Sequence, residues 1–104
     1  MNPAKVDRLR LQRLTDLPNI GPAGAKDLRL LGIELPEQLI GCCPYALYRE
    51  LCRITASRHD PCVIDVFISL TRFMAGEAPR SWWACSAERK LAVAGQPELV
   101  ALEA

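Results

Sequence analysis

The chain has 104 residues, of which half are hydrophobic and 24% are charged, and its formal net charge is +1. This balance suits one globular domain and excludes both a disordered chain and the strongly basic footprint of a tight general DNA-binding protein. No apolar run reaches the roughly 20 residues that cross a bilayer, and no secretory leader pattern opens the chain. With five cysteines, an odd number, we expect reduced thiols, a cytoplasmic protein and no membrane partner.

Helix signals appear from the start of the chain. Apolar residues at helical spacing predict a first helix over residues 4–17, which Pro18 ends. Pro22 suits a first helical position, and the second predicted helix runs from there to Leu31 before the stop at Gly32.

The middle of the chain predicts a short helical turn and then a longer helix. The turn opens at Pro36 and closes at Gly41, and the helix covers residues 44–54. The elements around Gly41 and Pro44 resemble a degenerate second copy of the preceding turn and helix, to which we assign no second phosphate site.

The most apolar predicted helix begins with Asp60 as N-cap and Pro61 at the first position, and it ends near residues 75–76. We expect it to be the core of the fold and to expose a narrow polar stripe of Asp65, Ser69 and Arg72 to water. Its predicted apolar face consists of Val63, Val66, Phe67, Leu70, Phe73 and Met74.

A last helix is predicted with Ser86 as N-cap and its end at Gly95. No segment shows the alternation of a strand, so the sequence predicts an all-α protein, a compact bundle of about five or six short helices. We expect one domain over residues 1–95 and a C-terminal tail over residues 96–104.

The turn before the second helix carries the clearest functional signal. Gly21 permits backbone angles that other residues resist, and Pro22 sets the direction of the helix. The first turn of a helix has unpaired N–H groups at the positive end of its dipole, which suits a phosphate. Ala23 and Gly24 supply such groups with small side chains, and Lys26 is the nearest cation.

Residues 17–33 resemble a helix-hairpin-helix motif, through the Ile-Gly-Pro turn at residues 20–22, Ala25, and the ending at residues 28–33. The resemblance implies a module that grips DNA backbone without reading sequence. Asn19 replaces the usual first glycine and tolerates a left-handed conformation better than most residues. Ala23 stands where many DNA-binding members have lysine or arginine, so one phosphate charge is missing.

The resemblance extends over about residues 12–91. Its further marks are the run Arg-His-Asp-Pro-Cys at residues 58–62, Trp82-Trp83, and Glu-Arg-Lys at residues 88–90. Together they resemble a small bacterial family of helix-hairpin-helix proteins known as pathogenicity-locus or mitomycin-resistance-like proteins. That likeness implies a stand-alone domain. The family labels do not establish a reaction.

We therefore expect a non-enzymatic module that contacts DNA backbone weakly and in a salt-sensitive way, with no catalytic residue, metal or cofactor. A protein-interaction adaptor that docks a partner through Trp82 and Trp83 is the alternative. A third reading, a thiol or metal protein, would use His59 and the cysteines, whose spacing fits zinc poorly. The expected nucleic-acid-binding residues are Asn19, Gly21, Ala23, Gly24 and Lys26.

Overall fold

The computed structural model describes residues 6–102, and this part of the chain is entirely helical apart from turns and loops. The predicted all-α class is confirmed, but the expected five or six helices are four α-helices with separate 3₁₀ turns in the described residues. The α-helices are α1 (Pro22–Leu30), α2 (Pro44–Thr55), α3 (Cys62–Met74) and α4 (Ser86–Gly95). The 3₁₀ turns are η2 (Arg8–Arg10), η3 (Leu14–Asp16), η4 (Pro36–Leu39), η5 (Trp82–Cys85) and η6 (Pro97–Val100).

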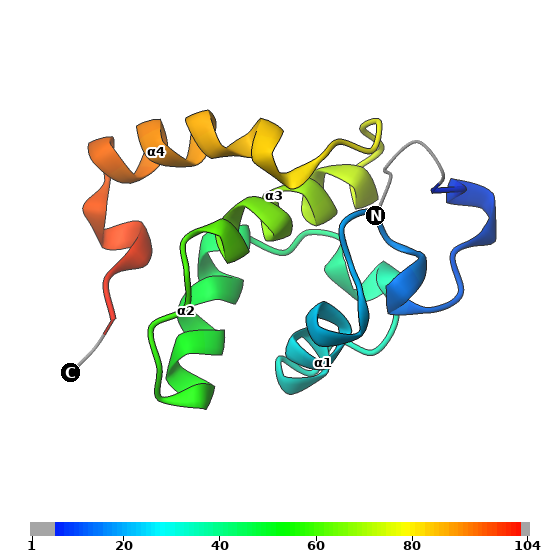
Figure 1. Ribbon diagram of the computed structural model, residues 1–104, viewed down its shortest axis with the longest axis horizontal. Helices are drawn as coiled ribbons and strands as arrows, with labels where there is room; N and C mark the ends of the chain where they lie inside the picture. Colours follow the sequence, from blue (N-terminus) through cyan, green and yellow to red (C-terminus); the bar gives the residue numbers. More distant parts are fainter. Residues whose placement is uncertain (1–5, 103–104) are drawn as a thin grey trace.

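Helix α3 lies in the middle of the molecule, with α4 along one side of it and α1 and α2 on the other (Figure 1). It contacts α2, α4, η4 and η5, which explains why it buries seven of its thirteen residues. Phe67, Leu70 and Phe73 from its predicted apolar face meet Tyr48 and Leu51 of α2 in the core. The helix is central as predicted, but its buried face is wider than expected, because Ile64 and Ile68 are buried as well, whereas the other residues of the predicted face, Val63, Val66 and Met74, are half-buried.

The predicted helix over residues 4–17 is wrong. Over its described part, residues 6–17, the chain forms the short turns η2 and η3, and residues 4–5 lie outside the described range. The carboxylate of Asp16 accepts hydrogen bonds from the backbone N–H groups of Gln12 and Arg13, at 3.0 and 2.8 Å. This local bonding gives the backbone an alternative to a helix, and it places Leu14 and Leu17 in the core.

The segment before α2 repeats the segment before α1 at a spacing of 22 residues. Gln38 takes the place of Asp16, because its side-chain oxygen accepts from the N–H groups of Glu34 and Leu35, at 2.7 and 2.8 Å. Other corresponding positions also match. Asn19 and Gly41 are both left-handed, with φ of 64° and 83°. Leu17 and Leu39 are both buried, and Pro22 and Pro44 are the first residues of their helices. The structure thus contains a second copy of the turn.

Three of the α-helices end with the same arrangement of backbone bonds. After α1, the N–H of Ile33 reaches the carbonyl of Leu28 at 2.9 Å, with Gly32 left-handed at φ 82°. The ends of α2 and α3 have matching bonds, from Ser57 N–H to Cys52 and from Glu77 N–H to Arg72. The left-handed residue is Gly76 after α3 but Ala56, at φ 51°, after α2.

The segment after Gly95 turns back onto α2 (Figure 1). Arg49 of α2 donates a hydrogen bond to the carbonyl of Leu99 at 2.7 Å, and Val100 and Leu102 pack against the core. The described part of the predicted tail, residues 96–102, is therefore attached to the domain. Within the described residues, no helix is long and apolar enough to span a membrane.

Candidate nucleic-acid interface

The turn between η3 and α1 is fixed by the side chain of Asn19. Its amide nitrogen donates to the hydroxyl of Ser69 in α3 at 3.0 Å and to the carbonyl of Arg80 at 2.7 Å. Asn19 is left-handed, as its sequence position suggests, and the next residue, Ile20, is fully buried. Asn19 therefore positions the turn from the inside, and its side-chain N–H groups point away from any ligand at the surface.

The expectation for Gly21 needs correction. Its φ of −98° and ψ of −171° are ordinary extended values, because the left-handed step of the turn falls on Asn19. A Cβ built on Gly21 meets nothing within 4 Å. Gly21 is therefore required neither by backbone geometry nor by packing inside the protein, and its hydrogen side chain leaves the space outside the turn empty.

The amide groups of Ala23 and Gly24 are unpaired. The first backbone bond of α1 runs from the N–H of Ala25 to the carbonyl of Gly21 at 3.0 Å, and Pro22 has no N–H. The N–H groups of Ala23 and Gly24 have no hydrogen-bond partner within residues 6–102. Ala23 is exposed and Gly24 is half-buried, so the two unpaired donors belong to one surface residue and one partly covered residue at the positive end of the α1 dipole.

Lys26 is the cation closest in sequence to these donors. It is exposed, lies one turn after Pro22, and helical side chains lean toward the N-terminus of their helix. Arg29 follows on the next turn, also exposed, and neither side chain forms an ion pair within the described part of the chain. Asp27 between them partly offsets their charge, so the surface around the turn is only mildly positive.

The second copy of the turn presents a different surface. Tyr45 stands where Ala23 stands in the first copy, and its half-buried ring packs against the core. This burial raises the pKa of the Tyr45 hydroxyl, with the Glu88 carboxylate as a smaller cause. A bulky side chain therefore occupies the position that is small and exposed before α1.

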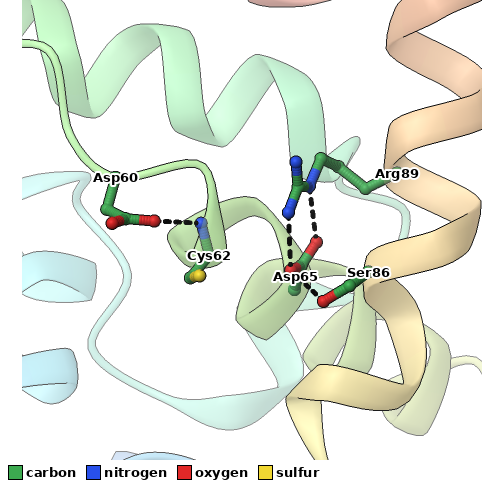
Figure 2. A network of polar contacts seen from close by, with 5 residues as sticks. All are labelled: Asp60, Cys62, Asp65, Ser86 and Arg89. Carbon is green, nitrogen blue, oxygen red and sulfur yellow. Dashed lines mark hydrogen bonds and ion pairs between the residues drawn. The ribbon is translucent and has the colours of Figure 1, made fainter.

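Asp65, Ser86 and Arg89 form a buried polar network between α3 and α4 (Figure 2). The Asp65 carboxylate is fully buried; it accepts two bonds from the Arg89 guanidinium, at 3.0 and 3.2 Å, and one from the Ser86 hydroxyl at 2.6 Å. The carboxylate in turn raises the pKa of the Arg89 guanidinium.

Two expectations are corrected by this network. Asp65 and Ser69 of the predicted stripe do not face water, because α4 and η5 cover this side of α3, whereas the side chain of Arg72 pairs with Glu88 of α4 and stays 37% exposed. Ser86 is the first residue of α4 instead of its N-cap, because η5 runs directly into the helix and its hydroxyl is bonded to Asp65. The signal missed in the sequence was the complementary polar set of Ser86, Glu88 and Arg89.

At the start of α3, the Asp60 carboxylate accepts a hydrogen bond from the backbone N–H of Cys62 at 2.8 Å (Figure 2). The helix begins at Cys62, one residue later than predicted, but Asp60 acts on its first turn as expected. The bond lowers the pKa of Asp60, and the same carboxylate raises the pKa of the half-buried Cys62 thiol. Cys62 is thus less buried than expected, whereas Cys52 and Cys85 are buried.

The single histidine, His59, is hydrogen-bonded to residues of α2. The ring of His59 lies 2.8 Å from the hydroxyl of Thr55, and its carbonyl accepts a hydrogen bond from Tyr48. All five cysteines are free, and no group of three potential metal ligands comes together in the described part of the molecule. The structure therefore bonds His59 to α2, where its backbone nitrogen also donates to the Cys52 Sγ at 3.5 Å.

The two tryptophans lie in η5, which packs on α3. Their rings are arranged edge to face, with the ring centroids 5.8 Å apart. Trp82 is half-buried. Trp83 is 63% exposed, and Leu91 of α4 is 77% exposed. Exposed apolar side chains therefore lie on η5 and α4, which are different elements from the turn before α1.

These features define a small all-α domain with an open helix N-terminus and a buried charge network that joins its last two helices. The chain belongs to the Pathogenicity locus family (Cdd1), whose pattern it matches over residues 7–91. It is also 34% identical over 83 residues to a protein of Streptomyces lavendulae called mitomycin resistance protein McrB, with 80% of this chain and 79% of that protein covered. The resemblance to pathogenicity-locus and mitomycin-resistance proteins noted in the sequence is confirmed. No solved structure matches the chain.

Proposed function

We propose that this protein is a non-enzymatic helix-hairpin-helix module that contacts the phosphate backbone of nucleic acid at the opening of α1, without reading bases. The observation that carries the proposal is the pair of unpaired N–H groups of Ala23 and Gly24 in the first turn of α1, next to the exposed Gly21 and Pro22. Backbone donors at a helix N-terminus suit a phosphate oxygen and carry no base information. The five free cysteines fit a reducing compartment, so we place this role in the cytoplasm.

The shape of the turn supports close approach of a polymer. Gly21 has open space around it, and Ala23 presents only a methyl group, so a phosphate can approach the donors without steric conflict. Asn19 holds the turn rigidly against α3 and the residues before η5. Within this proposal Asn19 is a positioning residue, whereas Gly21, Ala23, Gly24 and Lys26 face the ligand.

The charge of the molecule limits the expected affinity. With a net charge of +1 and Lys26 as the nearest cation, only a few phosphates can be neutralised. We expect weak binding, and the logarithm of the association constant should fall linearly with the logarithm of salt concentration at a slope of about −1 to −3. DNA is the expected ligand, and duplex and single-stranded forms bind alike where only the backbone is contacted.

The test is fluorescence anisotropy with labelled duplex, single-stranded and junction DNA over a series of salt concentrations. Gly21→Glu places a negative side chain at the open surface of the turn, and Lys26→Glu reverses the nearest charge. We expect both to weaken binding, and Lys26→Glu to reduce the salt slope by about 1.

Two control variants separate these effects from folding and from net charge. Gly21→Ala adds a methyl group in open space and should retain binding and stability. Lys90→Glu changes the net charge as Lys26→Glu does, but at an exposed position on α4. If Lys90→Glu weakens binding as much as Lys26→Glu, or if wild-type protein shows no salt-dependent binding at low ionic strength, the proposed interface is wrong.

A protein-interaction adaptor is the second candidate, and the exposure of Trp83 and Leu91 favours it. Exposed tryptophan is enriched among residues that dominate protein interfaces. In this alternative the turn before α1 is structural only. An absence of DNA binding, together with wild-type stability of Gly21→Glu, would leave the adaptor as the better function.

A further inference from the structure

A pocket of about 690 Å³ lies where the end of α2 meets the C-terminal segment. Arg49 and Arg53 line it from α2, Arg58 lines it from the loop after that helix, and Leu102 closes the other side. It is far along the chain from the turn before α1, and none of the residues of the proposed nucleic-acid interface borders it. The pocket is therefore a separate feature from the proposed nucleic-acid interface.

The charge around the pocket is positive. Among the described residues that line it, three carry a guanidinium group and one, Glu50, carries a carboxylate. The ion pair with Arg53 lowers the pKa of Glu50, so this carboxylate is charged at neutral pH and offsets one arginine. The end of the α2 dipole contributes about half a negative charge, which leaves an excess of positive charge among these described residues.

Two of the arginines are held in place before any ligand arrives. Arg49 donates one hydrogen bond to the carbonyl of Leu99 at 2.7 Å. Arg53 is oriented by Glu50, with its Nε 3.0 Å from a carboxylate oxygen. A guanidinium has five N–H donors in a fixed plane, so these contacts leave donors free for an oxyanion.

The remaining lining is apolar or small. Leu102, Ala101 and Ala56 form a surface next to the arginines, and the buried Cys52 lies at the base. A volume near 690 Å³ falls within the range of small-molecule sites and far exceeds what one inorganic phosphate fills. A ligand that satisfies both parts of the lining has an oxyanion at one end and an uncharged organic part at the other.

We infer that this pocket binds a small organic phosphate, with its phosphate held by Arg53 and Arg58 and its organic part against Ala56 and Leu102. Arg58 is exposed and forms no ion pair with the residues that the structure describes. Glu50 occupies Nε and one N–H of Nη2 of Arg53, which leaves Nη1 and the second N–H of Nη2 for the oxygens of a phosphate.

The probe is adenosine 5′-monophosphate, titrated into ¹⁵N-labelled full-length protein, with adenosine and inorganic phosphate as the two partial ligands. We expect saturable shifts in the backbone amides of residues 53–58 and 101–102 and in the arginine side chains. Adenosine 5′-monophosphate should bind at least about tenfold more tightly than either part alone, because each part contacts only one side of the pocket.

Arg53→Gln and Arg58→Gln should each weaken binding about tenfold, the effect of losing a charged hydrogen bond. Arg10→Gln is the matched control, since Arg10 is an exposed arginine in η2, paired with Asp7, at a distance from the pocket along the chain. The inference is overturned if no shifts occur at about 5 mM ligand, a concentration well above a millimolar Kd. It is also overturned if Arg10→Gln weakens binding equally, or if inorganic phosphate binds as tightly as the nucleotide.

Discussion

At the scale of single residues, the main finding is that a carboxylate with no exposed surface organises the contact between α3 and α4. Asp65 is 0% exposed and Arg89 is 14% exposed, so their ion pair is removed from water. Removing a charge from water costs free energy that only close pairing and hydrogen bonds offset. Ser86 supplies the additional hydrogen bond, which makes the network dependent on all three side chains.

The first prediction concerns this pair. Arg89→Met leaves the Asp65 carboxylate buried with Ser86 as its remaining side-chain partner. We expect the free energy of unfolding to fall by about 3–5 kcal/mol in urea denaturation, the usual cost of breaking a buried pair from one side. The double variant Asp65→Leu with Arg89→Met should recover a large part of the loss, and a single-variant loss below about 1 kcal/mol would contradict the assignment.

The second prediction concerns Asp60 and pH. The hydrogen bond from the Cys62 N–H lowers the pKa of Asp60. The charged carboxylate therefore stabilises the fold fully at pH values above the unfolded-state pKa of about 4. This contribution is lost as the pH falls through the lowered pKa of the folded state. Asp60→Asn lacks this charge at every pH. The difference in stability between wild type and Asp60→Asn should therefore be present at pH 7 and shrink below about pH 4 in thermal unfolding.

The same variant has a second measurable effect. The Asp60 carboxylate raises the pKa of the Cys62 thiol, so Asp60→Asn should increase the thiolate fraction and the alkylation rate of Cys62 at mildly alkaline pH. Peptide mass spectrometry measures this rate, with the exposed Cys43 in the same sample as the control. An equal change at both cysteines would contradict a local effect of Asp60.

At the scale of elements, the ends of α1, α2 and α3 share one backbone arrangement, but the end of α2 has alanine where glycine is favoured. Ala56 adopts a left-handed conformation after α2, where Gly32 and Gly76 occupy the equivalent positions after α1 and α3. A Cβ in this conformation costs about 1–2 kcal/mol relative to glycine. The strain lies next to the arginine-lined pocket, because Ala56 is one of its lining residues.

The third prediction is that Ala56→Gly stabilises the protein. The relief of strain exceeds the greater entropy of glycine in the unfolded chain, so we expect a gain of about 0.5–1 kcal/mol in the free energy of unfolding. The control is Ala87→Gly at an exposed position in α4, which should instead destabilise by about 1 kcal/mol. A loss of stability in Ala56→Gly would show that the left-handed step carries no strain.

At the scale of the whole molecule, periodicity and end signals were sufficient to predict α1, α2 and α3 to within a residue or two, because a proline lies at the start of each helix and a glycine follows α1 and α3. The N-terminal segment was mispredicted because the side chain of Asp16 competes for backbone donors, an effect that apolar spacing does not show. The turn before α1 was found from its local chemistry. The pocket of Arg49, Arg53 and Arg58 was not, because it depends on where the chain after Gly95 folds back.

The 22-residue repeat has a consequence for how the domain holds together. One unit, a 3₁₀ turn, a left-handed residue and a proline-opened helix, is too small to bury an apolar face alone. Both units therefore contribute to one shared interior, Ala25 and Leu28 from the first and Leu47, Tyr48 and Leu51 from the second. Neither unit is expected to fold when it is cut away from the other.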